Sequence, residues 1–135
     1  MKKSESLLWQ RIKKLKLKGQ IFRIESNTIN GIPDVYWLIN GKSIWIELKS
    51  NEVKNLGLSK YQINWHLNFQ QAGGTVRILN VGTSESRLEL LEIRESGVVE
   101  SLSRAAPSRP FMDNLYHLLV LGSQRWDPRH VHHYS

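Results

Sequence analysis

Two acids and a lysine between residues 33 and 49 have the types and spacing for metal-dependent phosphodiester cleavage. The segment reads PDVYWLINGKSIWIELK, two β-prone runs separated by Asn40-Gly41. This dipeptide is the strongest short-range signal for a two-residue hairpin turn. In the register that such a turn imposes, Asp34 lies opposite Glu47, with Cβ atoms roughly 4.5–5.5 Å apart. Lys49 emerges on the same face as Glu47, one step further along the strand.

Like charges that face each other across a sheet are destabilising unless a cation lies between them. Hard cations such as Mg²⁺ take one or two carboxylates together with waters and substrate phosphate oxygens, so Asp34 and Glu47 are sufficient. The backbone carbonyl of Leu48, between the two functional side chains of its strand, is a candidate for a further ligand. The cation would acidify a water and polarise the phosphate, while Lys49 would orient or deprotonate that water and offset developing charge.

An amphipathic helix is predicted over residues 4–17, before the hairpin. Its apolar residues recur at helical spacing: Leu8, Ile12 and Leu15. Ser4 is a candidate N-cap and Gly19 the predicted C-cap. Glu5 lies three residues before Leu8, near the buried edge of this helix. On the residues alone it is ordinary first-turn chemistry, because a carboxylate there favours the helix dipole.

A second helix is predicted after the hairpin, over about residues 60–72. Ser59 is its N-cap, Gln62 completes a capping box, and Gly73-Gly74 ends it. Residues 75–81 should form a strand parallel to the Glu47 strand, because a helix joins the two. Residues 20–25 are a further short β-prone run. The fold class is therefore α/β, with a central mixed sheet, the antiparallel hairpin at about 33–49, and flanking helices.

The last third of the chain gives weaker signals. Residues 87–93 fit a strand or a helix, and the preceding GTSES favours the strand; 105–110 has loop composition, and 113–121 predicts a short helix. We expect one domain over 1–135, with a core at about 4–93 and an extension at about 95–135 to which no role is assigned. His130, His132 and His133 are expected to be part of an unstructured or phosphate-contacting tail, not a metal site.

Composition favours an anionic partner. Nineteen Lys and Arg against twelve Asp and Glu give a net charge of +7, which suits nucleic acid. The lysines at 13, 14, 16 and 18 are either a solvated helix face or contacts to the DNA backbone. No cysteine is present, so any metal must be bound by oxygen or imidazole. The charged first residues and the lack of a long apolar run predict a cytoplasmic protein without membrane segments.

The pattern also resembles a known superfamily. Gly-Ile-Pro-Asp at 31–34, Ile-Glu-Leu-Lys at 46–49, and a helix that contains Gln62 and Trp65 and ends in Gly-Gly are similar to the PD-(D/E)XK nucleases. Within that superfamily the chain is most like the stand-alone virus-type replication-repair nuclease (VRR-NUC) domain, and more distantly like archaeal and phage Holliday-junction resolvases. The resemblance covers roughly residues 5 to 82.

The resemblance implies a restriction-endonuclease-like core and a role for each matched residue. Asp34 and Glu47 would be metal ligands and Lys49 the catalytic lysine. Glu5 would complete or support the metal site from the first helix, with Glu25 as the second choice for that part. Gln62 would be the glutamine that the superfamily places near the site, and its capping-box interpretation has equal weight.

The resemblance implies a deoxyribonuclease that uses Mg²⁺ or Mn²⁺. It would be an endonuclease selective for branched DNA, such as the Holliday junction, and would act in replication, recombination or repair. A homodimer follows from the resolvase resemblance, because a four-way junction needs two symmetric cuts. The compactness fits a phage origin, and the protein would then act in the host cytoplasm. Two alternatives stay open: a nicking, flap or restriction-like nuclease on other DNA, and a non-catalytic nuclease-like module that binds DNA.

Overall fold

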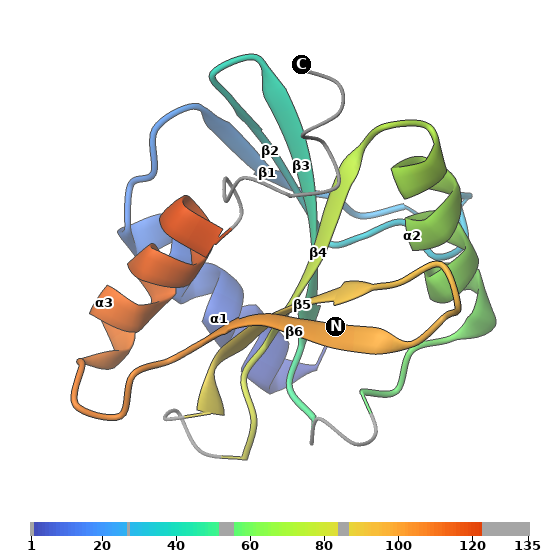
Figure 1. Ribbon diagram of the computed structural model, residues 1–135. Helices are drawn as coiled ribbons and strands as arrows, with labels where there is room; N and C mark the ends of the chain where they lie inside the picture. Colours follow the sequence, from blue (N-terminus) through green and yellow to red (C-terminus); the bar gives the residue numbers. More distant parts are fainter. Residues whose placement is uncertain (1, 27, 52–55, 84–86, 123–135) are drawn as a thin grey trace, which may run out of the picture.

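The computed structural model describes residues 2–26, 28–51, 56–83 and 87–122, and it confirms an α/β fold with a central mixed sheet (Figure 1). The six strands follow the order β1-β2-β3-β4-β5-β6, and β3–β4 is the parallel pair. The strands are β1 (Gln20–Arg23), β2 (Val35–Ile39), β3 (Lys42–Lys49), β4 (Thr75–Asn80), β5 (Glu89–Ile93) and β6 (Val99–Arg104). The helices are α1 (Lys3–Lys14), α2 (Lys60–Gln71) and α3 (Phe111–Tyr116), which continues as the π-helical segment η3 (His117–Gly122).

The predicted hairpin is present in the predicted register. Asn40 and Gly41 both have positive φ, 51° and 76°, as a tight hairpin turn requires. Ile39 pairs with Lys42 and Val35 with Ile46, so one further step brings Asp34 opposite Glu47. The turn chemistry alone therefore determines which residues of β2 and β3 face each other.

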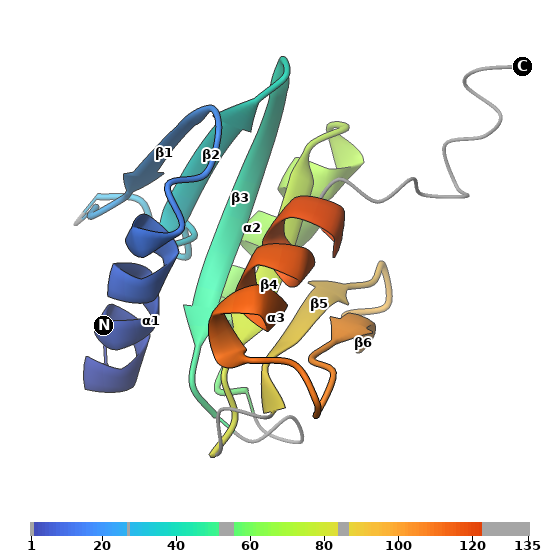
Figure 2. The same ribbon diagram turned by 90° about the vertical axis from the view of Figure 1, so that its left-hand side faces the viewer.

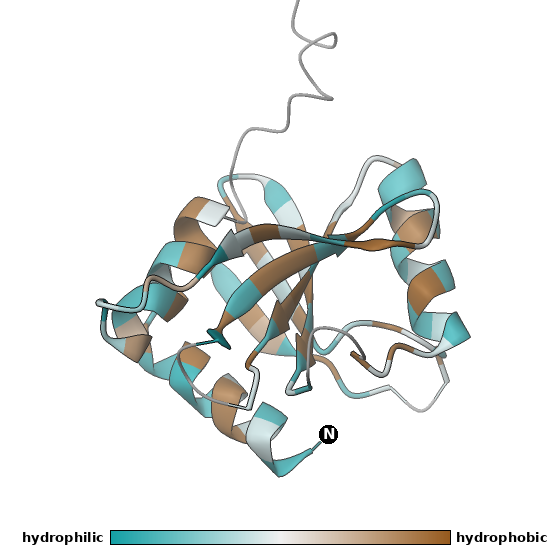
Figure 3. Ribbon diagram, turned by 60° about the horizontal axis from the view of Figure 1, so that its bottom comes forward, coloured by the Kyte–Doolittle hydropathy of each residue, from teal (hydrophilic) through white to brown (hydrophobic). Residues whose placement is uncertain are grey.

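Helices cover both faces of the sheet. Figure 1 shows α1 and α3 on one side and α2 on the other, and Figure 2 gives the same arrangement from a second side. The larger apolar cluster joins α1, α3 and η3 to the sheet, and the smaller one lies under α2. Figure 3 shows the resulting pattern, with hydrophobic central strands and hydrophilic residues on the outer sides of the helices. Within the described ranges, no helix has the length and apolar character needed to cross a membrane.

The first helix is shorter than predicted, and its caps differ. It begins at Lys3 after Lys2, so Ser4 is not the N-cap. It ends at Lys14 because Lys16 takes a left-handed conformation with a φ of 49°. Gly19 is therefore not the C-cap. It precedes β1 with a φ of 91°, and a Cβ there would lie 2.2 Å from the Leu38 carbonyl oxygen.

Residues 99–122 continue the same sheet and core. β5 pairs with β4 as expected, whereas β6 was not predicted; it pairs with β5 through an irregularity at Leu90/Leu91. The predicted short helix begins at Phe111, two residues early, and buries three leucines in the larger cluster: Leu115, Leu118 and Leu119. The tail with His130, His132 and His133 lies outside the described residues.

Candidate active site

The site lies where β3 passes under α2. Lys49 Nζ is 3.4 Å from Gln62 Oε1. One turn further along α2, His66 Nε2 is 3.7 Å from Glu47 Oε1. Two residues before Glu47, the Trp45 ring makes edge contacts with the rings of the same helix. Alternate residues of β3 thus meet successive turns of α2, and the acid and the lysine both lie on the α2 face.

Asp34 joins this pair from the residue just before β2. Its backbone carbonyl accepts a hydrogen bond from the Ile24 N–H at 2.7 Å, and its Oδ2 accepts one from the Leu48 N–H at 2.9 Å. In a strand, the N–H and C=O of one residue point to the same side. The carbonyl of Leu48 is therefore directed to the side of β3 on which Asp34 lies.

Gly31 fixes the loop that leads to Asp34. Its φ is +82°, and a Cβ there would lie 2.2 Å from the Tyr61 carbonyl oxygen in the first turn of α2. Only glycine allows the backbone to approach so closely at this φ. The Gly-Ile-Pro-Asp segment therefore rests against the helix that carries Gln62.

Burial raises the pKa values of both carboxyl groups. Burial raises the pKa of Asp34 to about 7, and the hydrogen bond and charge of Glu47 add to this effect. The pKa of Glu47, which is 3% exposed, is also raised, mainly by burial, although Asp34 and Lys49 act in the opposite direction. Close to neutral pH the pair thus binds a proton that ordinary carboxylates would have lost.

This pair fits a hard divalent cation. Glu47 is 3% exposed, so its carboxylate has little water to offset its charge. Two carboxylates and the Leu48 carbonyl supply only oxygen, which is the donor that Mg²⁺ and Mn²⁺ prefer. No three His, Asp or Glu side chains of the described residues converge into a complete metal-binding group. Waters and substrate phosphate oxygens would complete the shell, as is usual for Mg²⁺.

Glu5 approaches the pair and is also engaged at the end of its own helix. Its side chain is 7% exposed, and its charge contributes to the raised pKa of Glu47. Its Oε1 accepts from the Lys2 backbone N–H and its Oε2 from the Ser50 hydroxyl, each at 3.3 Å. The structure thus supports both the helix-end interpretation and a position beside the pair.

Glu25, the second choice for the acid that completes or supports the metal site, has a different environment from Glu5. Its side chain is 75% exposed and forms a 3.1 Å ion pair with Arg23.

Gln62 contacts both the capping serine of α2 and Lys49. It completes the capping box, because its Oε1 accepts from the Ser59 backbone N–H at 2.9 Å. The same oxygen lies 3.4 Å from Lys49 Nζ, which also approaches the Gly57 carbonyl at 3.3 Å. One side chain thus anchors the start of α2 and the lysine together.

His66 is the site residue that the sequence analysis did not single out. It is completely buried, and burial, together with the charge of Lys49, lowers its pKa to about 4. Its ring is therefore neutral at neutral pH. The sequence does contain one feature that indicates this position. His66 is four residues after Gln62, so the two side chains lie on the same face of the helix.

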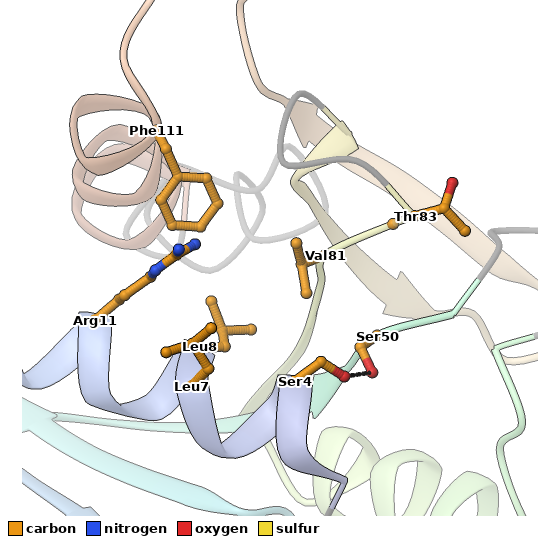
Figure 4. A pocket seen from close by; sticks show the side chains of 9 residues that line it. Ser4, Leu7, Leu8, Arg11, Ser50, Val81, Thr83 and Phe111 are labelled. Atoms are coloured by element: carbon orange, nitrogen blue, oxygen red, sulfur yellow. Dashed lines mark hydrogen bonds between the residues drawn. The ribbon is translucent and has the colours of Figure 1, made fainter.

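A pocket of about 320 Å³ lies on the opposite face of the sheet, between α1 and α3 (Figure 4). Arg11 lies over the Phe111 ring at its rim, 4.5 Å from the ring centroid. The hydroxyl of Ser4 donates to that of Ser50 at 2.6 Å. Because Ser50 in turn donates to Glu5, this pocket borders the residues that hold the acid of α1.

Comparison with known proteins adds no family. No protein-family model matches the chain, and no curated protein matches it at a significant level.

Proposed function

We propose that the protein is a metal-dependent endonuclease that hydrolyses DNA phosphodiester bonds with Mg²⁺ or Mn²⁺. The observation that carries this proposal is the pair of facing carboxyl groups, Asp34 and Glu47, whose pKa values are both raised, beside the ammonium group of Lys49. A buried pair of like charges costs stability, and strongly shifted pKa values cluster at functional sites. A divalent cation bound by the two carboxyl groups would offset this cost.

The residues around the cation have separable tasks. The cation would supply positive charge that polarises the scissile phosphate and acidifies water. Asp34, Glu47 and the Leu48 carbonyl would hold it, and Glu5 would support the pair from α1. Lys49, oriented by the oxygens of Gln62 and Gly57, would stabilise the charge that develops on the phosphate.

We propose branched DNA, such as a four-way junction, as the substrate, and a homodimer as the active form. The small chain and its net charge of +7 favour recognition through DNA shape and backbone over base reading. Two symmetric cuts would need two copies of the site.

The test is cleavage of three labelled DNAs: a four-way junction, a flap and a linear duplex, each with Mg²⁺, Mn²⁺ or EDTA. Glu47→Gln keeps the size of the side chain and removes the ligand charge. Glu95→Gln is the matched control, because it removes an exposed carboxylate in the turn between β5 and β6. Metal-dependent cutting of the junction that survives in the control and is lost in Glu47→Gln supports the proposal.

Other outcomes select among the alternatives. Preferred cutting of the flap or the duplex would replace the junction substrate and keep the nuclease. Tight DNA binding without cutting under any metal would refute catalysis and leave a DNA-binding module.

A further inference from the structure

The most unusual buried group in the described part of the chain is the imidazole of His66. Its side chain is completely buried, and neither ring nitrogen has a hydrogen-bond partner within those residues. Glu47 Oε1 lies 3.7 Å from Nε2 and is also without a hydrogen-bond partner within the described residues. A buried ring nitrogen and a buried carboxyl oxygen thus face each other, both unsatisfied, at the carboxyl pair.

Core positions in helices seldom keep an unsatisfied polar ring, because an apolar side chain of similar size is more stable there. The 3.7 Å separation exceeds a hydrogen bond, but a movement of about 0.5–1 Å would bring it to the usual length. A neutral imidazole carries a single N–H, and placing it on Nε2 directs it to Glu47 Oε1.

The spacing of α2 against β3 makes this contact part of a pattern. Glu47 and Lys49 are two residues apart on a strand, roughly 6.6 Å. Gln62 and His66 are four residues apart on a helix, roughly 6 Å along its axis. The two repeats match, so one helix can hold both functional side chains of β3, Gln62 at Lys49 and His66 at Glu47.

We propose that His66 is a positioning residue for the ligand Glu47: its Nε2–H donates to Glu47 Oε1 and leaves Oε2 to face Asp34 and the cation. This inference rests on the proposed nuclease function. It extends that function by assigning the orientation of the metal ligand to a residue on α2. Partners of this kind orient metal ligands, and their loss typically lowers metal affinity or activity about 10–100-fold.

The test compares two substitutions at the same position. His66→Leu removes the donor and suits an apolar core, whereas His66→Gln retains an N–H donor on a side chain of similar reach. Leu67→Ala is the matched control, because Leu67 packs on the apolar cluster under α2 and not at the carboxyl pair. For each protein we would measure the Mn²⁺ dissociation constant by calorimetry, kcat and KM on the cleaved DNA, and the urea midpoint.

His66→Leu is expected to weaken Mn²⁺ binding and lower kcat about 10–100-fold, with an unchanged KM for DNA and an unchanged or higher urea midpoint. His66→Gln should stay within about threefold of the wild type, and Leu67→Ala should lose stability but keep its Mn²⁺ affinity. In the metal-free protein, long-range ¹H–¹⁵N spectra of the imidazole should show the Nε2–H tautomer.

Each contrary result is decisive. Wild-type Mn²⁺ affinity and kcat in His66→Leu, or an Nδ1–H tautomer, would overturn the inference. If the wild type binds Mn²⁺ but cuts no DNA, the proposed nuclease function fails, and the Mn²⁺ affinities of the two variants still decide the role of His66. If the wild type binds no Mn²⁺, both proposals fall.

Discussion

Replacing Asp34 by asparagine should make the metal-free protein less sensitive to rising pH. The folded protein raises the pKa of Asp34 from its ordinary 3.8 to about 7. A raised pKa means that folding favours the protonated form, so this contribution to stability is complete below pH 4 and is lost as the pH rises through 7. Between pH 5 and pH 8, the loss is about 2–3 kcal/mol, because over much of this range the unfolded chain has released the proton and the folded protein still binds it.

The side chain of the Asp34→Asn variant would be neutral throughout and could still accept the hydrogen bond from the Leu48 N–H. Asp34→Asn should therefore become more stable relative to the wild type as the pH rises. The difference between their free energies of unfolding, variant minus wild type, should be about 2–3 kcal/mol larger at pH 8 than at pH 5. His66 has the opposite sign, because its pKa is lowered and its contribution is lost as the pH falls from 6.5 to about 4. The Asp34 charge raises the pKa of His66, but Asp34 is mostly protonated at pH 5, so the His66 contribution there is nearly the same in both proteins.

Urea unfolding in EDTA at both pH values, followed by tryptophan fluorescence, measures this difference, and the exposed-site control Glu95→Gln should show none. Mg²⁺ at about 100 times its dissociation constant should then stabilise the wild type at pH 8 by about 2.7 kcal/mol and leave Asp34→Asn unchanged. An equal gap between wild type and Asp34→Asn at pH 5 and pH 8 would refute the carboxyl-pair argument.

Three further outcomes are expected. The carboxyl pair retains a proton near neutral pH, so Mg²⁺ binding at pH 6.5 should release close to one proton. Calorimetry in buffers of different ionisation enthalpy measures this release. If no proton is released, the pair does not share one. Lys49→Met should lower the cleavage rate about 100-fold or more, because the lysine stabilises charge that develops on the phosphate. The variant should bind Mn²⁺ at least as tightly as the wild type, because a positive charge near the metal site is removed. Weaker Mn²⁺ binding would count against a role of Lys49 in charge stabilisation. Gly31→Ala should destabilise the fold by clearly more than Gly97→Ala. Both glycines have positive φ, 82° and 85°, but only a methyl group at 31 would meet another atom, the Tyr61 carbonyl oxygen at 2.2 Å. Equal urea midpoints for the two variants would show that this close approach does not matter.

The sequence by itself determined the parts of the site that depend on local geometry. The turn at Asn40-Gly41 sets the register of β2 and β3, so the facing positions of Asp34 and Glu47 followed from counting. The Ser59 cap and Gln62 are likewise neighbours in sequence, and a capping box needs nothing beyond its own turn. The strand period of two residues and the helix period of 3.6 residues show which side chains share a face of each element.

Only the tertiary structure decided which groups meet across elements. Nothing near His66 in the sequence shows that α2 packs over β3 and buries its ring beside Glu47. Gly19 is needed before β1 because the Leu38 carbonyl, on another strand, lies against it, and the sequence around Gly19 does not show this contact. The raised pKa of Asp34 has the same origin, because desolvation is a property of the packed site and not of any one residue.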